Sequence, residues 1–329
     1  MALDPISVEA ILRESQAPTA QVEAGGNSSV ARVTVDGNVY AVKDYSHRSD
    51  GFSRQQREWE ALTFLSGACP DLAPSPIWCS HDQPLAIHSW IAGSKPKWRS
   101  ETVSAMADIL TTLKDSFGRL PKDHGIPMAI DAVTHVSDLA NQVSKRITAF
   151  EEIDNPGLRH LSRHIEARLQ SLTAHLTERG PDRGVHLTLS PSDFGPHNMI
   201  YSFDEGAYRI IDLEFFGIDD VHKLIGDTVL HPQIFWTPPL LDQFLDDMRK
   251  VFNFSWDRLS EFLPFLSLKW AAIVSSRLER LGRSSEIDDS GNELSDLAFF
   301  YLDIAQAGDA DGVLSRIVER DPDLGGTRK

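Results

Sequence analysis

The chain has 329 residues and a formal net charge of −16, from 48 acidic and 32 basic residues. An acidic surface repels phosphate groups, so this balance argues against nucleic acids and anionic membranes as main partners. The only cysteines, Cys69 and Cys79, are too few for a disulfide framework and favour a reducing compartment. With no signal sequence and no apolar run of membrane-spanning length, the cytoplasm is the expected location.

The first predicted elements are a short helix and a β-hairpin. Apolar residues at helical spacing predict the helix over residues 5–15. Alternating valines on either side of the turn Asp36-Gly37 predict the hairpin. The entrance to this hairpin, residues 25–29, is rich in glycine and serine. Its backbone amides, including that of Ser28, could cover the phosphates of a nucleotide, although an ordinary turn explains the same composition equally well.

Lys43 ends the apolar strand over residues 40–43 and precedes a predicted helix over 52–65. A lysine at the end of a strand is usually solvated, which is the simplest interpretation. The helix, however, presents Glu58, with Glu60 as the alternative. An acid on this helix could pair with Lys43 and direct its ammonium group toward the phosphates of a nucleotide.

A further strand is predicted over residues 84–93, and beyond Gly93 the pattern becomes helical. Apolar stripes predict core-facing helices over 103–117, 161–176, 241–252 and 262–281, and another helix begins at Val221. The twelve histidines show no metal-ligand spacing, so His186, His197 and His231 are expected to have structural roles.

The most informative stretch runs from residue 189 to residue 220. Asp193 and Asn198 lie five positions apart in a loop punctuated by proline and glycine. A predicted hairpin, residues 199–201 and 208–211, follows and ends at Asp212. Asp and Asn are common in turns for local reasons, so the spacing alone is weak. A loop acid, an amide and a strand-end acid together could hold a hydroxyl nucleophile and Mg²⁺, as phosphoryl transfer requires.

These residues resemble the catalytic segment of the aminoglycoside phosphotransferase and choline kinase family. The similarity lies in Asp193-Phe-Gly-Pro-His-Asn198, the hairpin, and Ile210-Ile-Asp-Leu-Glu214. It implies Asp193 as catalytic base and Asn198 and Asp212 as Mg²⁺ ligands. Where the family usually has a histidine two residues before the catalytic acid, this chain has Pro191. The loop therefore resembles a variant with the sequence Ser-Pro-Ser-Asp-Phe-Gly.

The resemblance extends to the rest of the chain. Lys43 corresponds to a phosphate-binding lysine and Glu58 to its partner, and residues His88 to Ile91 correspond to the hinge that flanks adenine. Asp227 corresponds to an acid that braces the catalytic loop. Asp193-Phe-Gly also spells the metal-binding motif of protein kinases, but no His-Arg-Asp-like loop precedes it and no Ala-Pro-Glu-like segment follows it.

The implied fold is α+β and bilobal, like that of protein kinases. It combines a small antiparallel β lobe over residues 1–92, which binds nucleotide, with a larger, mostly helical lobe over 93–329. The expected cofactors are ATP and Mg²⁺, and the expected acceptor is a small polar molecule such as a sugar, an amino-alcohol or an aminoglycoside. Trp236 and Trp270 are acceptor-site candidates, although core aromatics are more common. The alternative function is a pseudokinase that binds nucleotide as a scaffold, and the sequence predicts no oligomeric state.

Overall fold

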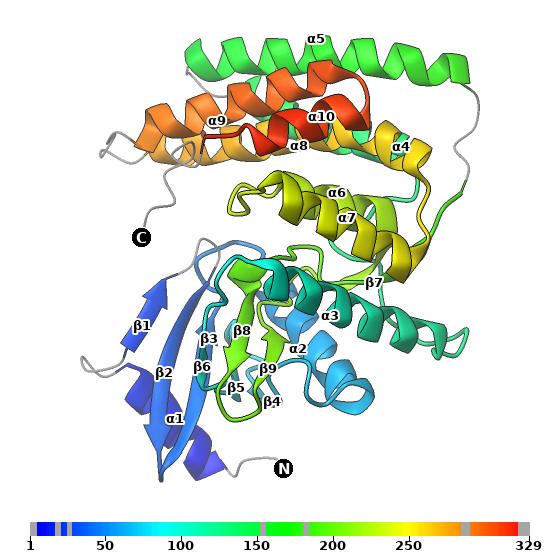
Figure 1. Cartoon of the computed structure of the whole chain (residues 1–329). Coiled ribbons are helices and arrows are strands. Elements are labelled where there is room, and N and C mark those ends of the chain that lie inside the picture. The colour runs from blue at the N-terminus through cyan, green and yellow to red at the C-terminus, as the bar shows by residue number, and fades with distance from the viewer. Residues whose placement is uncertain are drawn as a thin grey trace. The chain divides into compact units, whose positions relative to one another are not determined.

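The computed structural model describes residues 5–16, 21–24, 28–151, 156–179, 184–283 and 290–321 (Figure 1). Contacts between residues divide the chain into two compact units. Unit 1 contains Met1–Trp98, Asp108–Ile130 and Leu189–Gly217, and unit 2 contains Arg99–Ala107, Asp131–Thr188 and Ile218–Lys329. The segment that carries the predicted loop, Leu189–Gly217, therefore packs in the same unit as the N-terminal strands.

Unit 1 is built on a five-stranded antiparallel sheet with the strand order β1-β2-β3-β5-β4. The strands are β1 (Gln21–Ala24), β2 (Ser29–Val35), β3 (Asn38–Asp44), β4 (Pro76–Cys79) and β5 (Leu85–Ser89). The turn between β2 and β3 has Asp36 and Gly37 in the left-handed region, at φ of 51° and 78°. This backbone matches the right-handed twist of the flanking strands, which explains why the Asp-Gly pair predicts the hairpin correctly.

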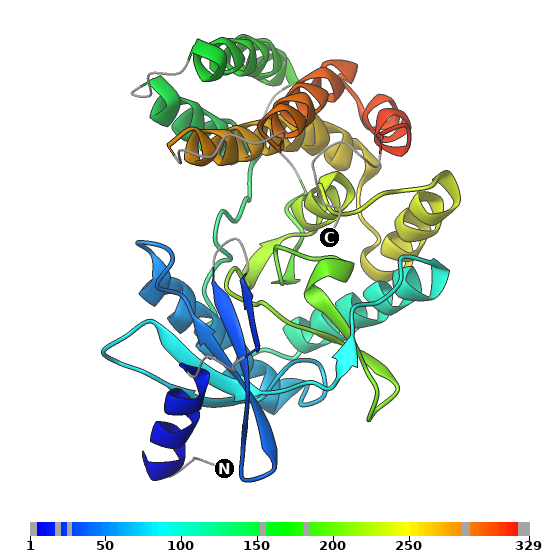
Figure 2. The same ribbon diagram turned by 90° about the vertical axis from the view of Figure 1, so that its left-hand side faces the viewer.

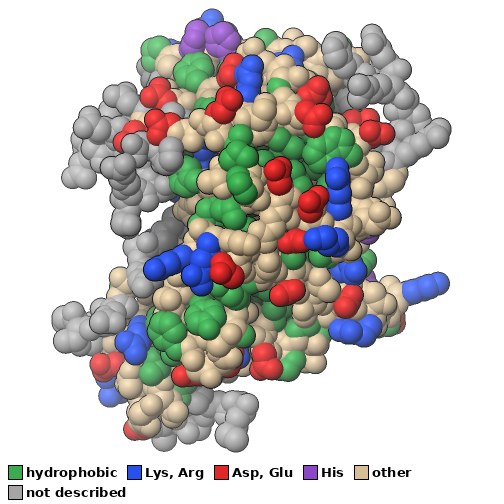
Figure 3. Space-filling view, viewed as in Figure 1, with side chains coloured by type: hydrophobic (Ala, Val, Ile, Leu, Met, Phe, Trp, Pro, Cys, Tyr) green, Lys and Arg blue, Asp and Glu red, His purple; other side chains and the backbone are tan. Residues whose placement is uncertain are grey.

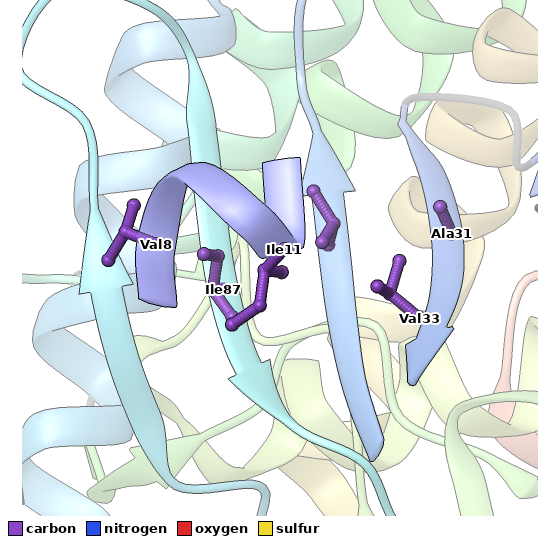
Figure 4. Packing of buried hydrophobic residues seen from close by; sticks show 6 residues of the cluster. Val8, Ile11, Ala31, Val33 and Ile87 are labelled. Carbon is purple, nitrogen blue, oxygen red and sulfur yellow. The ribbon is translucent and has the colours of Figure 1, made fainter. Parts of the chain in front are cut away.

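The two faces of this sheet are used differently because successive side chains on a strand point to opposite sides. On one face, Val8 and Ile11 of α1 (Pro5–Ser15) pack against apolar side chains of β2, β3 and β5, including Val33, Val42 and Ile87 (Figure 4). The neighbours of Val42 and Ile87 along their strands, Lys43 and His88, consequently face away from α1.

The rest of unit 1 places the loop that contains Asp193. Helix α2 (Gly51–Ala68) follows β3 and contacts β4 and β5. A three-stranded sheet has the order β6-β8-β9, from β6 (Gly93–Ser94), β8 (Met199–Ser202) and β9 (Ala207–Ile210). The 3₁₀ turn η1 (Pro196–Asn198) leads directly into β8. The hairpin predicted after Asn198 is therefore present.

Unit 2 consists of helices arranged around one long helix, α8 (Trp256–Arg283). Helix α8 contacts most of the others, as Figures 1 and 2 show. They are α4 (Val136–Glu151), α5 (Pro156–Arg179), α6 (Val221–Leu230), α7 (Pro238–Phe252), α9 (Ser290–Ile304), η2 (Ala305–Ala307) and α10 (Ala310–Val318). The apolar stripes predicted from the sequence supply the buried residues of these helices, including Leu161, Phe244, Phe262 and Leu266.

Three elements cross the division between the units. Helix α3 (Ser100–Gly118) contributes its first residues to unit 2 and the remainder to unit 1. Strands β7 (Leu187–Ser190) and β10 (Gly217–Asp220) pair with each other, and each has residues in both units. A lobe boundary after residue 92 stays a prediction. The first stretch of unit 1 ends nearby, at Trp98, but unit 1 also includes two later stretches.

The acidic side chains on one face of the molecule are dispersed. On the face shown in Figure 3, acidic side chains alternate with Lys and Arg instead of gathering in one patch. The net charge of −16 thus gives no direct indication of a cationic ligand on that face. No helix among the described residues has both the length and the apolar character that crossing a membrane requires.

Candidate active site

The best-defined polar cluster of unit 1 lies where β3 meets α2. Lys43 Nζ donates to Glu58 Oε2 at 2.7 Å, and the hydroxyl of Tyr45 donates to the same oxygen at 2.7 Å. The ring centroid of Tyr45 lies 5.0 Å from Lys43 Nζ. Gly51, the first residue of α2, allows the helix to begin close to the backbone of Tyr45, because a Cβ at position 51 would lie 2.2 Å from the Tyr45 carbonyl oxygen. The ion pair expected from the sequence is present, and Tyr45 is a member of the cluster that sequence analysis missed.

Asp212 joins this cluster from the segment after β9. Its Oδ1 accepts from Lys43 Nζ at 2.5 Å, and its side chain keeps 36% of its surface exposed. Its backbone is left-handed, at φ 62°, which is uncommon for a residue other than glycine and is often found at functional sites. Burial alone lowers the pKa of Lys43, but the charges of Asp212 and Glu58 outweigh burial and raise it above its usual value. The ammonium group is therefore fully charged at neutral pH.

Glu214, two residues further on, is a buried acid with a cationic partner on α2. Its Oε1 accepts from Arg54 Nη1 at 2.7 Å, and its side chain is only 1% exposed. Burial and the charge of Asp212 raise the pKa of Glu214 to about 7, although Lys43 and Arg54 oppose this shift. Arg54 was not identified from the sequence. Its position one helical turn before Glu58 was the available signal, because residues four apart share a helix face.

The loop that carries Asp193 is held by its own polar groups. Asn198 Nδ2 donates to the Asp193 carbonyl oxygen at 3.0 Å, and His197 Nε2 lies 3.0 Å from Asp193 Oδ1. The Asp193 side chain is 34% exposed, so a ligand can reach it. Ser192, immediately before Asp193, is left-handed at φ 64°. The sequence did not predict this contact of His197 with the predicted catalytic acid, and the structural role of His197 stays a prediction.

The other predicted nucleotide-binding residues are distributed around β2 and β5. Ser28 is buried at the start of β2, while the neighbouring residues 25–27 lie outside the described part of the chain. His88 is buried on the face of β5 that Lys43 shares, and its two ring nitrogens have no hydrogen-bond partner within the described residues. Ile91 is buried just after β5. Their contact with a nucleotide stays a prediction.

The arrangement of Asn198 and Asp212 suits a hard cation such as Mg²⁺. The backbone links the two, because the Ile211 N–H donates to the Asn198 carbonyl oxygen at 2.9 Å. The Asn198 amide nitrogen is engaged by the loop, which leaves its side-chain oxygen as the available donor atom. A neutral amide oxygen together with a partly exposed carboxylate is a donor set that Mg²⁺ accepts. The residues present therefore fit the ion.

Comparison with known proteins relates this chain to others by structure alone. No family model matches the sequence, and no curated protein matches it. Among solved structures, choline kinase LicA from Streptococcus pneumoniae has a TM-score of 0.60 at 16% identity, covering 91% of this chain and 99% of that chain. Aminoglycoside phosphotransferase APH(4)-Ia has a TM-score of 0.61 at 15% identity, covering 93% and 98%. Amicoumacin kinase hAmiN, solved with AMP-PNP and Ca²⁺, has a TM-score of 0.59 at 13% identity, covering 92% and 94%.

The chain has a kinase-like α+β fold. The fold class expected from the sequence is therefore confirmed. Identities this low relate the architectures and leave the activity to be argued from the residues of the site. The five residues on which the catalytic interpretation depends all lie in unit 1: Lys43, Glu58, Asp193, Asn198 and Asp212.

Proposed function

We propose that the protein is a Mg²⁺·ATP-dependent kinase that phosphorylates a hydroxyl group of a small polar molecule. The observation that carries this proposal is the set of bonds around Asp212. Lys43 joins Asp212 to Glu58. The Ile211 amide joins the backbone just before Asp212 to Asn198. The proposed phosphate-binding lysine and the proposed cation ligands thus belong to one continuous set of contacts in unit 1.

Each residue of the site would have a different role in phosphoryl transfer. Lys43, held by Glu58, would bind the phosphates of the nucleotide. Asn198 and Asp212 would hold Mg²⁺, which supplies charge neutralisation to the phosphate oxygens when bound. Asp193 would accept a hydrogen bond from the acceptor hydroxyl, orient it, and take its proton. His197, beside Asp193 Oδ1, would fix the direction of that carboxylate.

The proposed acceptor class is based on kinases with similar structures, which act on different small molecules. The names of the similar structures include a choline kinase, an aminoglycoside phosphotransferase and an amicoumacin kinase. We therefore propose an amino-alcohol, an aminoglycoside or a sugar as the acceptor, without preference among them. The nucleotide proposal gains support from AMP-PNP in the amicoumacin kinase structure.

Calorimetric titration of the full chain with ATP, in Mg²⁺ and in EDTA, tests the metal and nucleotide assignments together. The parent should bind ATP more tightly in Mg²⁺ than in EDTA. Asp212→Ala should lose about 100-fold or more of the Mg²⁺-dependent affinity, because even the outer partners of a metal ligand typically matter 10–100-fold. Asp204→Ala, an exposed acid in the β8–β9 turn, is the matched control and should titrate like the parent.

The outcomes separate the proposal from its alternatives. Equal titration by Asp212→Ala and the parent would show that the metal assignment is wrong. Failure of the parent to bind ATP under either condition would refute the kinase. Tight Mg²⁺·ATP binding without turnover on any acceptor would instead favour the pseudokinase.

A further inference from the structure

One face of helix α2 is bonded to the chain segment that follows Asp212. Arg54 and Glu58 lie four residues apart and so share this face. Glu58 Oε1 accepts from the Leu213 backbone N–H at 3.1 Å, while Arg54 Nη1 donates to Glu214 Oε1 at 2.7 Å. Two consecutive residues after Asp212 are therefore held by two successive turns of one helix.

Arg57, on the same face of α2, extends this set of bonds. Its Nη1 donates to the Phe216 carbonyl oxygen at 3.3 Å and to the Met128 carbonyl oxygen at 2.7 Å. Residues 213–216 thus meet a continuous row of α2 side chains, which we call the α2 clamp: Arg54, Arg57 and Glu58. Every bond of the clamp lies inside unit 1.

Arg54 is the member whose surroundings are most specific. Arg54 is only 6% exposed. Besides Glu214, its Nε donates to Asp50 Oδ2 at 2.8 Å, and its guanidinium carbon lies 4.6 Å from the centroid of the Phe215 ring. A planar guanidinium offers a rigid fork of donors and a flat face, which suits two carboxylates and an aromatic ring at once.

The charge of Arg54 matters because the carboxylates near Asp212 outnumber the cations. Lys43 is already shared between Glu58 and Asp212. Glu214 is buried, and Arg54 is the cation with which it forms an ion pair. Removing Arg54 would break the buried ion pair that holds Glu214 against α2, and the loss of one partner of a buried ion pair is strongly unfavourable.

We propose that Arg54 is a positioning residue for the metal-binding acid. By neutralising Glu214 and holding it against α2, Arg54 fixes the segment that sets the place of the Asp212 carboxylate. This inference rests on the proposed function, since it concerns the affinity of that site for Mg²⁺.

The test measures the free Mg²⁺ concentration that gives half-maximal enhancement of ATP binding, using the full chain. Arg54→Met should require about tenfold more Mg²⁺ than the parent, as partners of a metal ligand commonly do. Its ATP affinity in EDTA should stay within about twofold of the parent value, because the Lys43–Glu58 pair remains. A general loss of stability would not move the Mg²⁺ requirement of the folded protein in this selective way.

Two further variants make the experiment specific for the ion pair. Combining Arg54→Met with Glu214→Gln removes both charges, so the Mg²⁺ requirement should return to within about threefold of the parent. Arg48→Met is the matched control, because Arg48 also contacts Asp50, at 3.4 Å, and is bonded to none of residues 213–216. It should need the same Mg²⁺ concentration as the parent.

Each outcome is decisive. An unchanged Mg²⁺ requirement in folded Arg54→Met would overturn the inference, even if the variant melted at a lower temperature. A double variant as impaired as Arg54→Met would also overturn it, since charge balance would then not be the cause. Arg54→Gln, which keeps a donor but no charge, should show the same shift and serves if Arg54→Met does not fold. Failure of the parent to bind ATP would refute the proposed function, and the inference with it. If the parent binds ATP normally, the result for Arg54→Met tests the role of Arg54 alone.

Discussion

Two clusters of buried charges, one in each unit, are balanced differently. In unit 1, Lys43 is shared by the carboxylates of Glu58 and Asp212, and Arg54 is shared by those of Glu214 and Asp50. Asp212 keeps about a third of its side-chain surface exposed. This cluster therefore combines an excess of negative charge with access from outside.

In unit 2, Lys223 on α6 and Lys269 on α8 face Asp219 and Asp227, and Lys269 Nζ also lies 3.9 Å from Oδ2 of Asp131, which pairs with Arg146. Lys223 Nζ lies 2.7 Å from Asp219 Oδ2 and 3.0 Å from Asp227 Oδ2, and Lys269 Nζ lies 3.9 Å from Asp227 Oδ2. The Lys223 and Asp219 side chains are almost completely buried, at 2% and 0% exposed. Burial alone lowers the pKa of Lys223, but Asp219 and Asp227 outweigh it and raise the pKa.

This difference distinguishes a candidate ligand-binding site, the cluster of unit 1, from a structural ion-pair cluster, that of unit 2, which we call the brace. A buried cluster with balanced charges stabilises one arrangement of helices and leaves no charge for a ligand to neutralise. An accessible cluster with surplus carboxylates is stabilised further when a cation arrives. The excess of acid at Asp212 is consequently a stronger indication of metal binding than burial or an altered pKa alone, which both clusters share.

The largest expected effect on stability is at the brace. Lys223→Met would leave the buried Asp219 without its lysine and Asp227 with only the more distant Lys269, so the free energy of unfolding should fall by about 3–5 kcal/mol. Urea denaturation measures this change. Lys250→Met, on the surface of α7 beside Asp247, is the control and should be indistinguishable from the parent. Wild-type stability in Lys223→Met would mean that the two clusters do not differ as described.

A second prediction uses the pH dependence of stability and concerns His88. Burial lowers the pKa of His88 to about 4, from an ordinary value of 6.5. At pH values between about 4 and 6.5, the unfolded chain therefore binds a proton at His88 that the folded chain does not bind. The free energy of unfolding consequently decreases as the pH falls below 6.5. Between pH 7 and pH 5 this one group should cost about 2 kcal/mol.

His88→Phe keeps a ring on the Lys43 face of β5 and removes the titrating group. Urea denaturation at pH 7 and pH 5 should show a smaller loss of stability in this variant than in the parent. An identical loss in both proteins would mean that His88 binds its proton equally well when folded.

The smallest predicted effect concerns His197, which touches Asp193. His197→Leu should lower kcat about tenfold and leave KM for ATP unchanged, because the histidine contacts the proposed base and would act by orienting it. His197→Gln, which keeps a polar group near Asp193 Oδ1, should retain more activity. Acceptor-dependent ADP release gives both values, and equal kcat values for His197→Leu and the parent would remove His197 from the mechanism.

Much of unit 1 could be predicted from the sequence because its signals are local. Alternating valines around Asp36-Gly37 define the β2–β3 hairpin, and the Asp193-x₄-Asn198 spacing followed by a hairpin and an acid carries the resemblance to kinases. The Lys43–Glu58 pair was predictable because a strand-end lysine and an acid on the following helix are close in the chain.

Other features of the site depend on contacts that local patterns do not encode. The partners Arg54 and Glu214 are separated by 160 positions, so no local sequence pattern indicates that they pair. The grouping of Leu189–Gly217 with the N-terminal strands is also a long-range packing result. His197 was predicted to be structural because nothing in a short polar loop indicates which side chain turns toward Asp193.

The central claim is that Asp193 accepts the hydroxyl proton in a kinase reaction. The most direct test is ADP release from Mg²⁺·ATP with a panel of sugars, amino-alcohols and aminoglycosides, comparing the parent with Asp193→Asn and, as control, Asp204→Asn. The account predicts turnover stimulated by at least one acceptor, lost by about 10³-fold in Asp193→Asn and retained in Asp204→Asn. Acceptor-stimulated turnover that survives in Asp193→Asn would contradict it.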